Sequence, residues 1–417
     1  MTGPDPPVPD RSHTLPEGFV SSRESPFLRA PEEVRTIYFV TMAAAALPLL
    51  GGLVLFGWRA AVVIAVSVAS CAVAERLYYR VTRAPALLGR SHAYLTGLLL
   101  AMTLPAGAPW YVPAVAGAFA IIVGKAVFGG VGHFLWQPAL VGRLAVAVLF
   151  ASALNPPLWP VLGRDKLFWG DVRLAAEGHA ASDGGEWLDR RAPEGADAML
   201  LPPPLATLDG LSRGDEPQYS ALAYPPEAAD PAPPRPTLMG RLPSILDVLI
   251  GARGGGIGET PVVLIALGGL YLIYRNCVKW QLPAAMLGAA ALVAMAAPIR
   301  LFGAGGAPVT VWWPALSGEG EVGLLYVCYQ LCAGGLVLAA FFLAPEMTSR
   351  PVTPGGQVVF GAAVGAAAML LQLYIDTPIP AYLAVLALNT LTPAIEAVVR
   401  PRVLGASRWP WRRRGKN

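Results

Sequence analysis

Long apolar runs without charged residues alternate with short polar connections along most of this chain. No Asp, Glu, Lys or Arg lies between Arg90 and Lys125, and similar runs recur in the second half. Lipid hydrocarbon satisfies neither a charge nor an open backbone hydrogen bond, and a spanning helix needs roughly 20 apolar residues unless it is broken and buried in protein. The runs therefore predict about ten transmembrane helices. They lie near residues 36–57, 60–79, 93–105, 110–128, 138–155, 260–275, 281–299, 322–344, 356–375 and 380–399.

The composition favours one all-α polytopic membrane domain over several soluble domains. Hydrophobic residues make up 55% of the 417 residues and charged residues 14%, so lipid is the expected surrounding of most helices. The formal net charge of +4 is too small to indicate nucleic acid as a partner. Residues 1–35 are polar and Pro-rich without an apolar core, so we expect the first span to direct insertion itself.

Basic residues mark one side of the predicted membrane. Arg35 precedes the first span, Arg80 lies in the second connection, Lys279 lies in the sixth, and several Arg residues follow the last span. Under the positive-inside rule these residues belong in the cytoplasm, and an even number of spans then places both termini there. The long connection between the fifth and sixth spans is consequently expected outside.

The chain divides into two halves around that external, Pro-rich loop. Thr96–Pro105 resembles Gly334–Pro345 in sequence, which indicates a repeat. Five spans per repeat require opposite insertion of the two copies and create an interface between them near mid-membrane. The alternative is that Leu-, Ala- and Gly-rich helices resemble one another by composition alone. The expected organisation is a tail 1–35, a first five-helix repeat 36–155, a loop 156–259, a second, inverted five-helix repeat 260–405 and a basic tail 406–417.

Lys125 and Arg143 are the candidate functional charges of the first half. They flank a glycine-rich turn and stand beside apolar segments, where an unpaired charge costs roughly 2.5–3.5 kcal/mol. They either create a positive field near an anionic cofactor or a cation path, or Lys125 simply extends to the cytoplasmic surface.

A second glycine-rich turn opens the second half, with Gly256, Gly258, Glu259 and Thr260 just before a span. Free backbone amides at a helix start bind phosphate groups in many proteins, so these residues are candidates for cofactor binding. The alternative is that Glu259 and Thr260 only cap the helix.

The sequence gives little support for a metal site. His92 and His133 have no second ligand at metal-ligand spacing. Cys328 and Cys332 share a helix face and would need two further thiolates to hold an iron–sulfur cluster, and buried inert cysteines are far commoner. No cysteine falls in the external loop, which argues against a disulfide framework.

Several longer motifs follow one another along the chain. They are Leu95ThrGlyLeuLeuLeuAlaMetThrLeuPro, Gly124Lys with the following PheGlyGly and GlnProAlaLeuValGlyArg, Gly256IleGlyGluThr, Phe341PheLeuAla, Pro351ValThrProGlyGlyGln and Thr392ProAlaIleGlu with the following ArgProArgValLeuGly. In this order they resemble motifs of the D subunit of Rnf electron-transport complexes and of the B subunit of the sodium-pumping NADH:quinone oxidoreductase. The resemblance runs from about Arg35 to Gly405.

The resemblance implies a membrane subunit of a complex that couples electron transfer to sodium or proton movement. It also implies a prokaryotic cytoplasmic membrane, further membrane and peripheral subunits as partners, and FMN esterified to a Thr in an external motif like DAxSGATPLA. The nearest match here is Asp197–Ala206, where Pro203 occupies the threonine position and has no hydroxyl. Covalent FMN is therefore not expected, although a shifted alignment offers Thr207, and noncovalent flavin remains an alternative.

Two acids near segment ends are the candidates for an ion path, Glu346 and Asp376. Glu346 stands in Ala344ProGluMet, where the family commonly has ATDP. Either acid also has an ordinary explanation as a charge at a helix end.

The expected function is a subunit of a redox-driven, ion-translocating oxidoreductase complex, with its own catalytic part left open. The rivals are a channel or solute-transporter subunit without redox chemistry and an assembly or anchoring protein.

Overall fold

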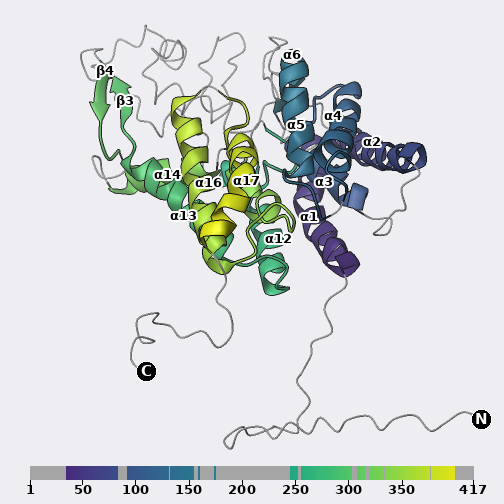
Figure 1. The fold of residues 1–417 in the computed structure, drawn as a ribbon. Coiled ribbons are helices and arrows are strands. Elements are labelled where there is room, and N and C mark those ends of the chain that lie inside the picture. Colours follow the sequence, from purple (N-terminus) through teal and green to yellow (C-terminus); the bar gives the residue numbers. More distant parts are fainter. Residues whose placement is uncertain are drawn as a thin grey trace, which may run out of the picture.

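The computed structural model describes the chain mainly in its apolar segments, and these are mostly helical (Figure 1). The described residues are 34–82, 92–130, 132–154, 158–159, 173–174, 245–251, 255–302, 308–314, 320–332, 334–375 and 377–399.

Helices of the first half follow the predicted segments closely. The π-helical turn η1 continues α4 directly, and such turns occur often at functional sites. The elements are α1 (Val34–Phe56), α2 (Trp58–Thr82), α3 (His92–Thr103), α4 (Tyr111–Ile121), η1 (Ile122–Ala126), α5 (Pro138–Leu149) and α6 (Ala151–Leu154).

The second half has the same kind of helices, and its eighth predicted segment is interrupted. The elements are α11 (Ile245–Ile250), α12 (Val262–Tyr274), α13 (Gln281–Ala296), α14 (Gly320–Cys332), α15 (Leu336–Leu338), the π-helical η3 (Ala339–Leu343), α16 (Pro354–Tyr374) and α17 (Pro380–Val398).

Among the described residues, two short antiparallel strand pairs add to the helices that the sequence predicted. β1 (Leu158–Trp159) pairs with β2 (Arg173–Leu174), and β3 (Ile299–Phe302) pairs with β4 (Pro308–Val311). The pair of β3 and β4 follows α13 in the chain and projects from the helices (Figure 1).

Length and hydropathy mark the chain as a multi-pass membrane protein. Among the residues that the structure describes, four helices are long and apolar enough to span a bilayer, namely α1, α2, α16 and α17. A fifth span is possible if the pair Tyr326–Cys332 and Leu336–Leu343, bent by 62°, counts as one. The other apolar helices are shorter than a spanning helix normally is, as expected for segments that are broken and packed inside protein.

The two halves show similar packing. In the first half α2 packs on α3 and α4, and α4 packs on α5; in the second, α13 packs on α16 and α16 on α17. Figure 1 shows the halves side by side, and α1 contacts α12 where they meet. Glycines permit the close contacts: a Cβ at Gly117 of α4 would overlap Ser70 Oγ of α2, and one at Gly365 of α16 would overlap Met286 O of α13.

Candidate functional site

The glycine-rich turn of the second half packs against the C-terminal end of α3 in the first half. Ile257 N donates to Leu104 O (2.9 Å) and Gly258 N donates to Met102 O (3.0 Å). The last carbonyls of a helix have no partner within the helix, and here the turn supplies two of the missing donors. A Cβ at Gly258 would lie 2.5 Å from the Met102 side chain, so the close approach requires glycine.

Arg143 supplies a further donor to the same helix end. Its Nε donates to Thr103 O (3.0 Å), and the residue is 6% exposed. Its Nη1 has no hydrogen-bond partner among the described residues. The guanidinium interacts electrostatically with Tyr382 and Glu259, and the Tyr382 hydroxyl donates to Glu259 Oε2 (3.1 Å). Arg143 therefore faces a polar cluster that residues of both halves build.

The amides of the turn are mostly used inside the protein. Besides the bonds of Ile257 and Gly258 to α3, Glu259 N and Thr260 N both donate to Gly256 O. These amides are not open to a phosphate group in this conformation. Helix α12 begins at Val262, with Pro261 at its N-cap position and no side-chain cap bond there. Thr260 is buried, and its Oγ1 has no partner among the described residues.

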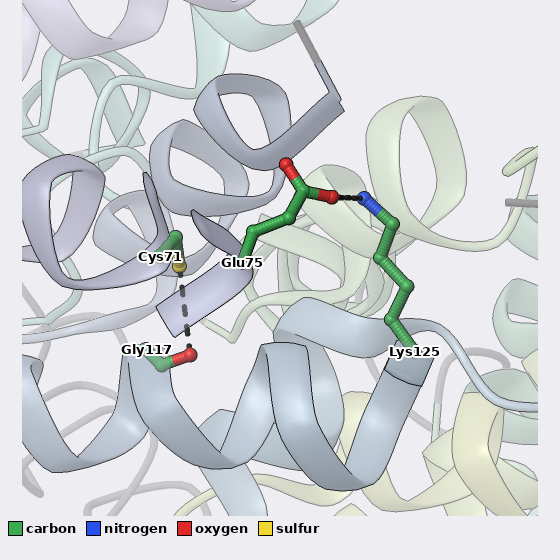
Figure 2. Close-up of polar contacts among 4 residues, drawn as sticks. All are labelled: Cys71, Glu75, Gly117 and Lys125. Carbon is green, nitrogen blue, oxygen red and sulfur yellow. Dashed lines mark hydrogen bonds and ion pairs between the residues drawn. The ribbon is translucent and has the colours of Figure 1, made fainter. Parts of the chain in front are cut away.

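Lys125 lies in η1 and pairs with Glu75 of α2. Figure 2 shows the two side chains pointing at one another. The Lys125 Nζ lies 2.5 Å from Glu75 Oε1. Only 3% of the Lys125 side chain and 17% of the Glu75 side chain are exposed. Lys125 therefore points inward, and the alternative that it extends to the membrane surface is not what the structure shows.

Contacts between α2 and the α4–η1 segment hold this ion pair in place. Tyr78 Oη donates to Ala126 O (3.2 Å), and Cys71 Sγ lies 3.8 Å from Gly117 O. Figure 2 shows Cys71 one turn before Glu75, facing the same segment. The close packing at Gly117 brings α2 near enough for Glu75 to reach Lys125.

Glu346 lines two small cavities, and Lys125 lines one of them. The smaller, of about 10 Å³, is lined by Lys125 and Glu346 together with oxygen-bearing Thr96 and Gln137. The larger, of about 30 Å³, is lined by Glu346, Tyr38, Thr41 and the apolar side chains around them. Both volumes suit one or a few water-sized molecules or ions. Neither has room for the three fused rings of a flavin, so these residues do not fit that cofactor as they stand.

Other predicted site residues are not placed in this cluster. Pro203, Thr207 and Asp376 lie outside the described residues. His133 is exposed, and Cys328 and Cys332 are free thiols. Within the described part of the chain, no group of three His, Cys, Asp or Glu residues stands where it would hold a metal ion.

Sequence reasoning missed Glu75 and Tyr382. Glu75 was detectable, because an acid inside an apolar segment is rare and usually has a partner. Tyr382 carried no comparable signal, since a Tyr near a segment end is common.

A family model described as the NQR2, RnfD, RnfE family matches residues 21–405. The chain belongs to this family. The match extends the resemblance seen in the motifs to nearly the whole sequence, and it includes the α3 end, the glycine-rich turn and Lys125.

Curated relatives of the NQR2, RnfD, RnfE family align over almost their whole length. The D subunit of an ion-translocating oxidoreductase complex from Halorhodospira halophila is 31% identical, covering 92% of this chain and 95% of the relative. The D subunit of a proton-translocating ferredoxin:NAD(+) oxidoreductase complex from Clostridium ljungdahlii is 30% identical, covering 92% and 96%. The D subunit of a Na(+)-translocating ferredoxin:NAD(+) oxidoreductase complex from Acetobacterium woodii is 28% identical, covering 92% and 95%.

Proposed function

We propose that this chain is the membrane subunit of an Rnf- or Nqr-like complex that couples electron transfer to cation movement. The observation that carries the proposal is the alignment over 92% of the chain with D subunits of ion-translocating oxidoreductase complexes. The other membrane and peripheral subunits of such a complex are its partners. The relatives include proton- and sodium-translocating members, so the cation is one of these two.

The topology we propose is ten transmembrane helices in two inverted five-helix repeats, with both termini in the cytoplasm of a prokaryotic cell. The similar packing of α2 on α4 and of α13 on α16 supports the repeat. Arg80 at the end of α2 and Lys279 between α12 and α13 support the orientation, because cytoplasmic connections carry an excess of basic residues.

The cation path we propose runs through the cavities beside Glu346 and Lys125. These charges lie among apolar helices, and charged residues inside membrane proteins commonly mark ion pathways. Arg143 and Glu259 form a second polar cluster at the meeting of the two halves. We propose that they hold the C-terminal end of α3 and the glycine-rich turn together. Asp376 is a further candidate for the ion path.

We further propose that the subunit carries no covalent FMN. Pro203 offers no hydroxyl for a phosphoester at the position that the family motif assigns to threonine. The denatured, purified chain should therefore show no flavin fluorescence on a gel, even after coexpression with a flavin transferase. A fluorescent band that disappears in Thr207→Ala would show instead that FMN is attached at the shifted position.

Affinity purification tests the proposed assembly directly. A tagged chain solubilised in mild detergent should bring down the other subunits of an oxidoreductase complex in fixed ratio.

The second candidate function is a channel or solute-transporter subunit on the same fold, and the ion-sized cavities together with Pro203 favour it. Recovery of the chain without any redox partner would support that candidate and contradict the complex.

A further inference from the structure

Lys125 lies between two carboxylates that belong to different halves of the molecule. Its ammonium pairs with Glu75 of α2, while its side chain also lines the smaller cavity together with Glu346. The positive charge of Lys125 acts on Glu346 as well. One buried ammonium therefore has two carboxylates within its influence and is paired with only one of them.

The surroundings restrict where this ammonium can go. A lysine head on its flexible four-carbon stem can move, but an unpaired charge among apolar helices is costly. If Lys125 leaves Glu75, the stable alternative is the other carboxylate that lines its cavity, Glu346. Gln137 and Thr96 line the same cavity, and Gln137 Oε1 accepts a hydrogen bond from Leu140 N (3.1 Å) at the start of α5.

The positive and negative side chains around Glu346 are equal in number when no transported cation is bound. Arg350 acts on Glu346, and its backbone N donates to Glu346 O (3.3 Å). The guanidinium itself donates through Nη2 to Cys277 O (3.4 Å). When all four groups are ionised, the carboxylates of Glu75 and Glu346 equal in number the cations that act on them, Lys125 and Arg350. Tyr38 and Cys277 line the larger cavity. A cation that binds Glu346 adds a charge to this balanced set, so it competes with the positive charges already present.

We propose that Lys125 is a tethered cation that alternates between Glu75 and Glu346 and competes with the transported cation for Glu346. With Lys125 on Glu75, as in this structure, Glu346 accepts the transported cation. Movement of Lys125 to Glu346 then displaces that cation. The inference rests on the proposed function, because it requires a cation at Glu346.

Two single variants test this exchange because they act in opposite directions. Lys125→Met removes the competitor, so the affinity of Glu346 for the cation should rise about tenfold, the effect of one nearby charge. Glu75→Gln removes the resting partner, so Lys125 moves to Glu346 and the affinity should fall about tenfold. A salt bridge that only stabilises the fold would weaken cation binding in both variants.

The measurements use the complex purified with its partner subunits. Binding of ²²Na⁺ reports sodium affinity, and the infrared carboxyl band of Glu346 reports proton affinity, so the two possible cations are distinguished. Lys279→Met removes an exposed lysine and should leave both readouts unchanged. Glu346→Gln should abolish the signal.

Each outcome decides a stated claim. If Lys125→Met does not fold, Lys125→Arg keeps the charge, and its guanidinium should stay on Glu75 through paired hydrogen bonds, so the affinity at Glu346 should again rise. Changes in the same direction in the Lys125 and Glu75 variants, with binding still lost in Glu346→Gln, overturn the inference alone. A wild-type complex that binds neither sodium nor a proton at Glu346 overturns the proposed ion path and this inference with it.

Discussion

At the scale of single residues, the two charged side chains that lie buried in the described part of the chain, Lys125 and Arg143, each bind a group from a distant part of the sequence. Glu75 and Lys125 are 50 residues apart in sequence, and Arg143 binds the carbonyl of Thr103. The sequence identified Lys125 and Arg143 as unusual, because charges among apolar residues stand out. It did not reveal their partners, since pairing across helices depends on which faces pack together.

Removal of either member of the Glu75–Lys125 pair should destabilise the protein. Lys125→Met leaves the partly buried Glu75 carboxylate without its partner, which typically costs about 3 kcal/mol. Glu75→Gln should cost less, because Lys125 can then pair with Glu346. The double variant carries no orphan charge, so its loss of stability should be smaller than the sum of the two single losses by about 1–3 kcal/mol. Thermal unfolding of the full chain in detergent measures all three. Additive losses would show that the pair does not form.

At the scale of helices, the apolar runs predicted where helices lie but not how they are interrupted. The predicted segments near 36–57 and 380–399 correspond closely to α1 and α17. The segment near 322–344 is instead divided into α14, α15 and η3, and α4 changes to the π-helical η1 at Ile122. Hydropathy is averaged over many residues, whereas a helix break depends on local hydrogen bonds that packing with another segment supplies.

The glycine-rich turn shows why a motif alone did not define its role. Its glycines were expected to leave amides open for a phosphate, and in the structure Ile257 and Gly258 donate theirs to the end of α3. Both interpretations require small residues and free amides. The two interpretations differ only in what accepts hydrogen bonds from these amides. Here the acceptor is the end of α3, which lies about 150 residues away in sequence.

Helix packing gives a prediction with an internal control. Gly365→Ala places a methyl group against Met286 O of α13 and should cost about 1–3 kcal/mol through overpacking. Gly288→Ala lies in α13, where a Cβ would have no neighbour within 4 Å, and should be neutral or stabilising because alanine favours helix. Thermal unfolding of both variants in detergent tests this. Equal effects at the two positions would contradict the close contact of α13 and α16.

At the scale of the whole molecule, the two halves meet through polar contacts as well as apolar packing. The glycine-rich turn binds the end of α3, and Trp136 Nε1 donates to Thr390 Oγ1 of α17 (2.9 Å). The charged cavities lie beside this junction, with Lys125 from the first half and Glu346 from the second. A small relative movement of the halves would therefore change the separation of these two charges, which is what ion translocation by such an interface requires.

Redox-driven cation uptake into membrane vesicles tests the central claim most directly. Vesicles from cells that contain the chain and its partner subunits should accumulate sodium or protons when a reduced electron donor is added. Vesicles from cells that lack only this chain should not, and supplying the gene again should restore uptake. Uptake that proceeds unchanged without the chain, or cation flux through the chain that is independent of any electron donor, would contradict its role as a subunit of a redox-driven pump.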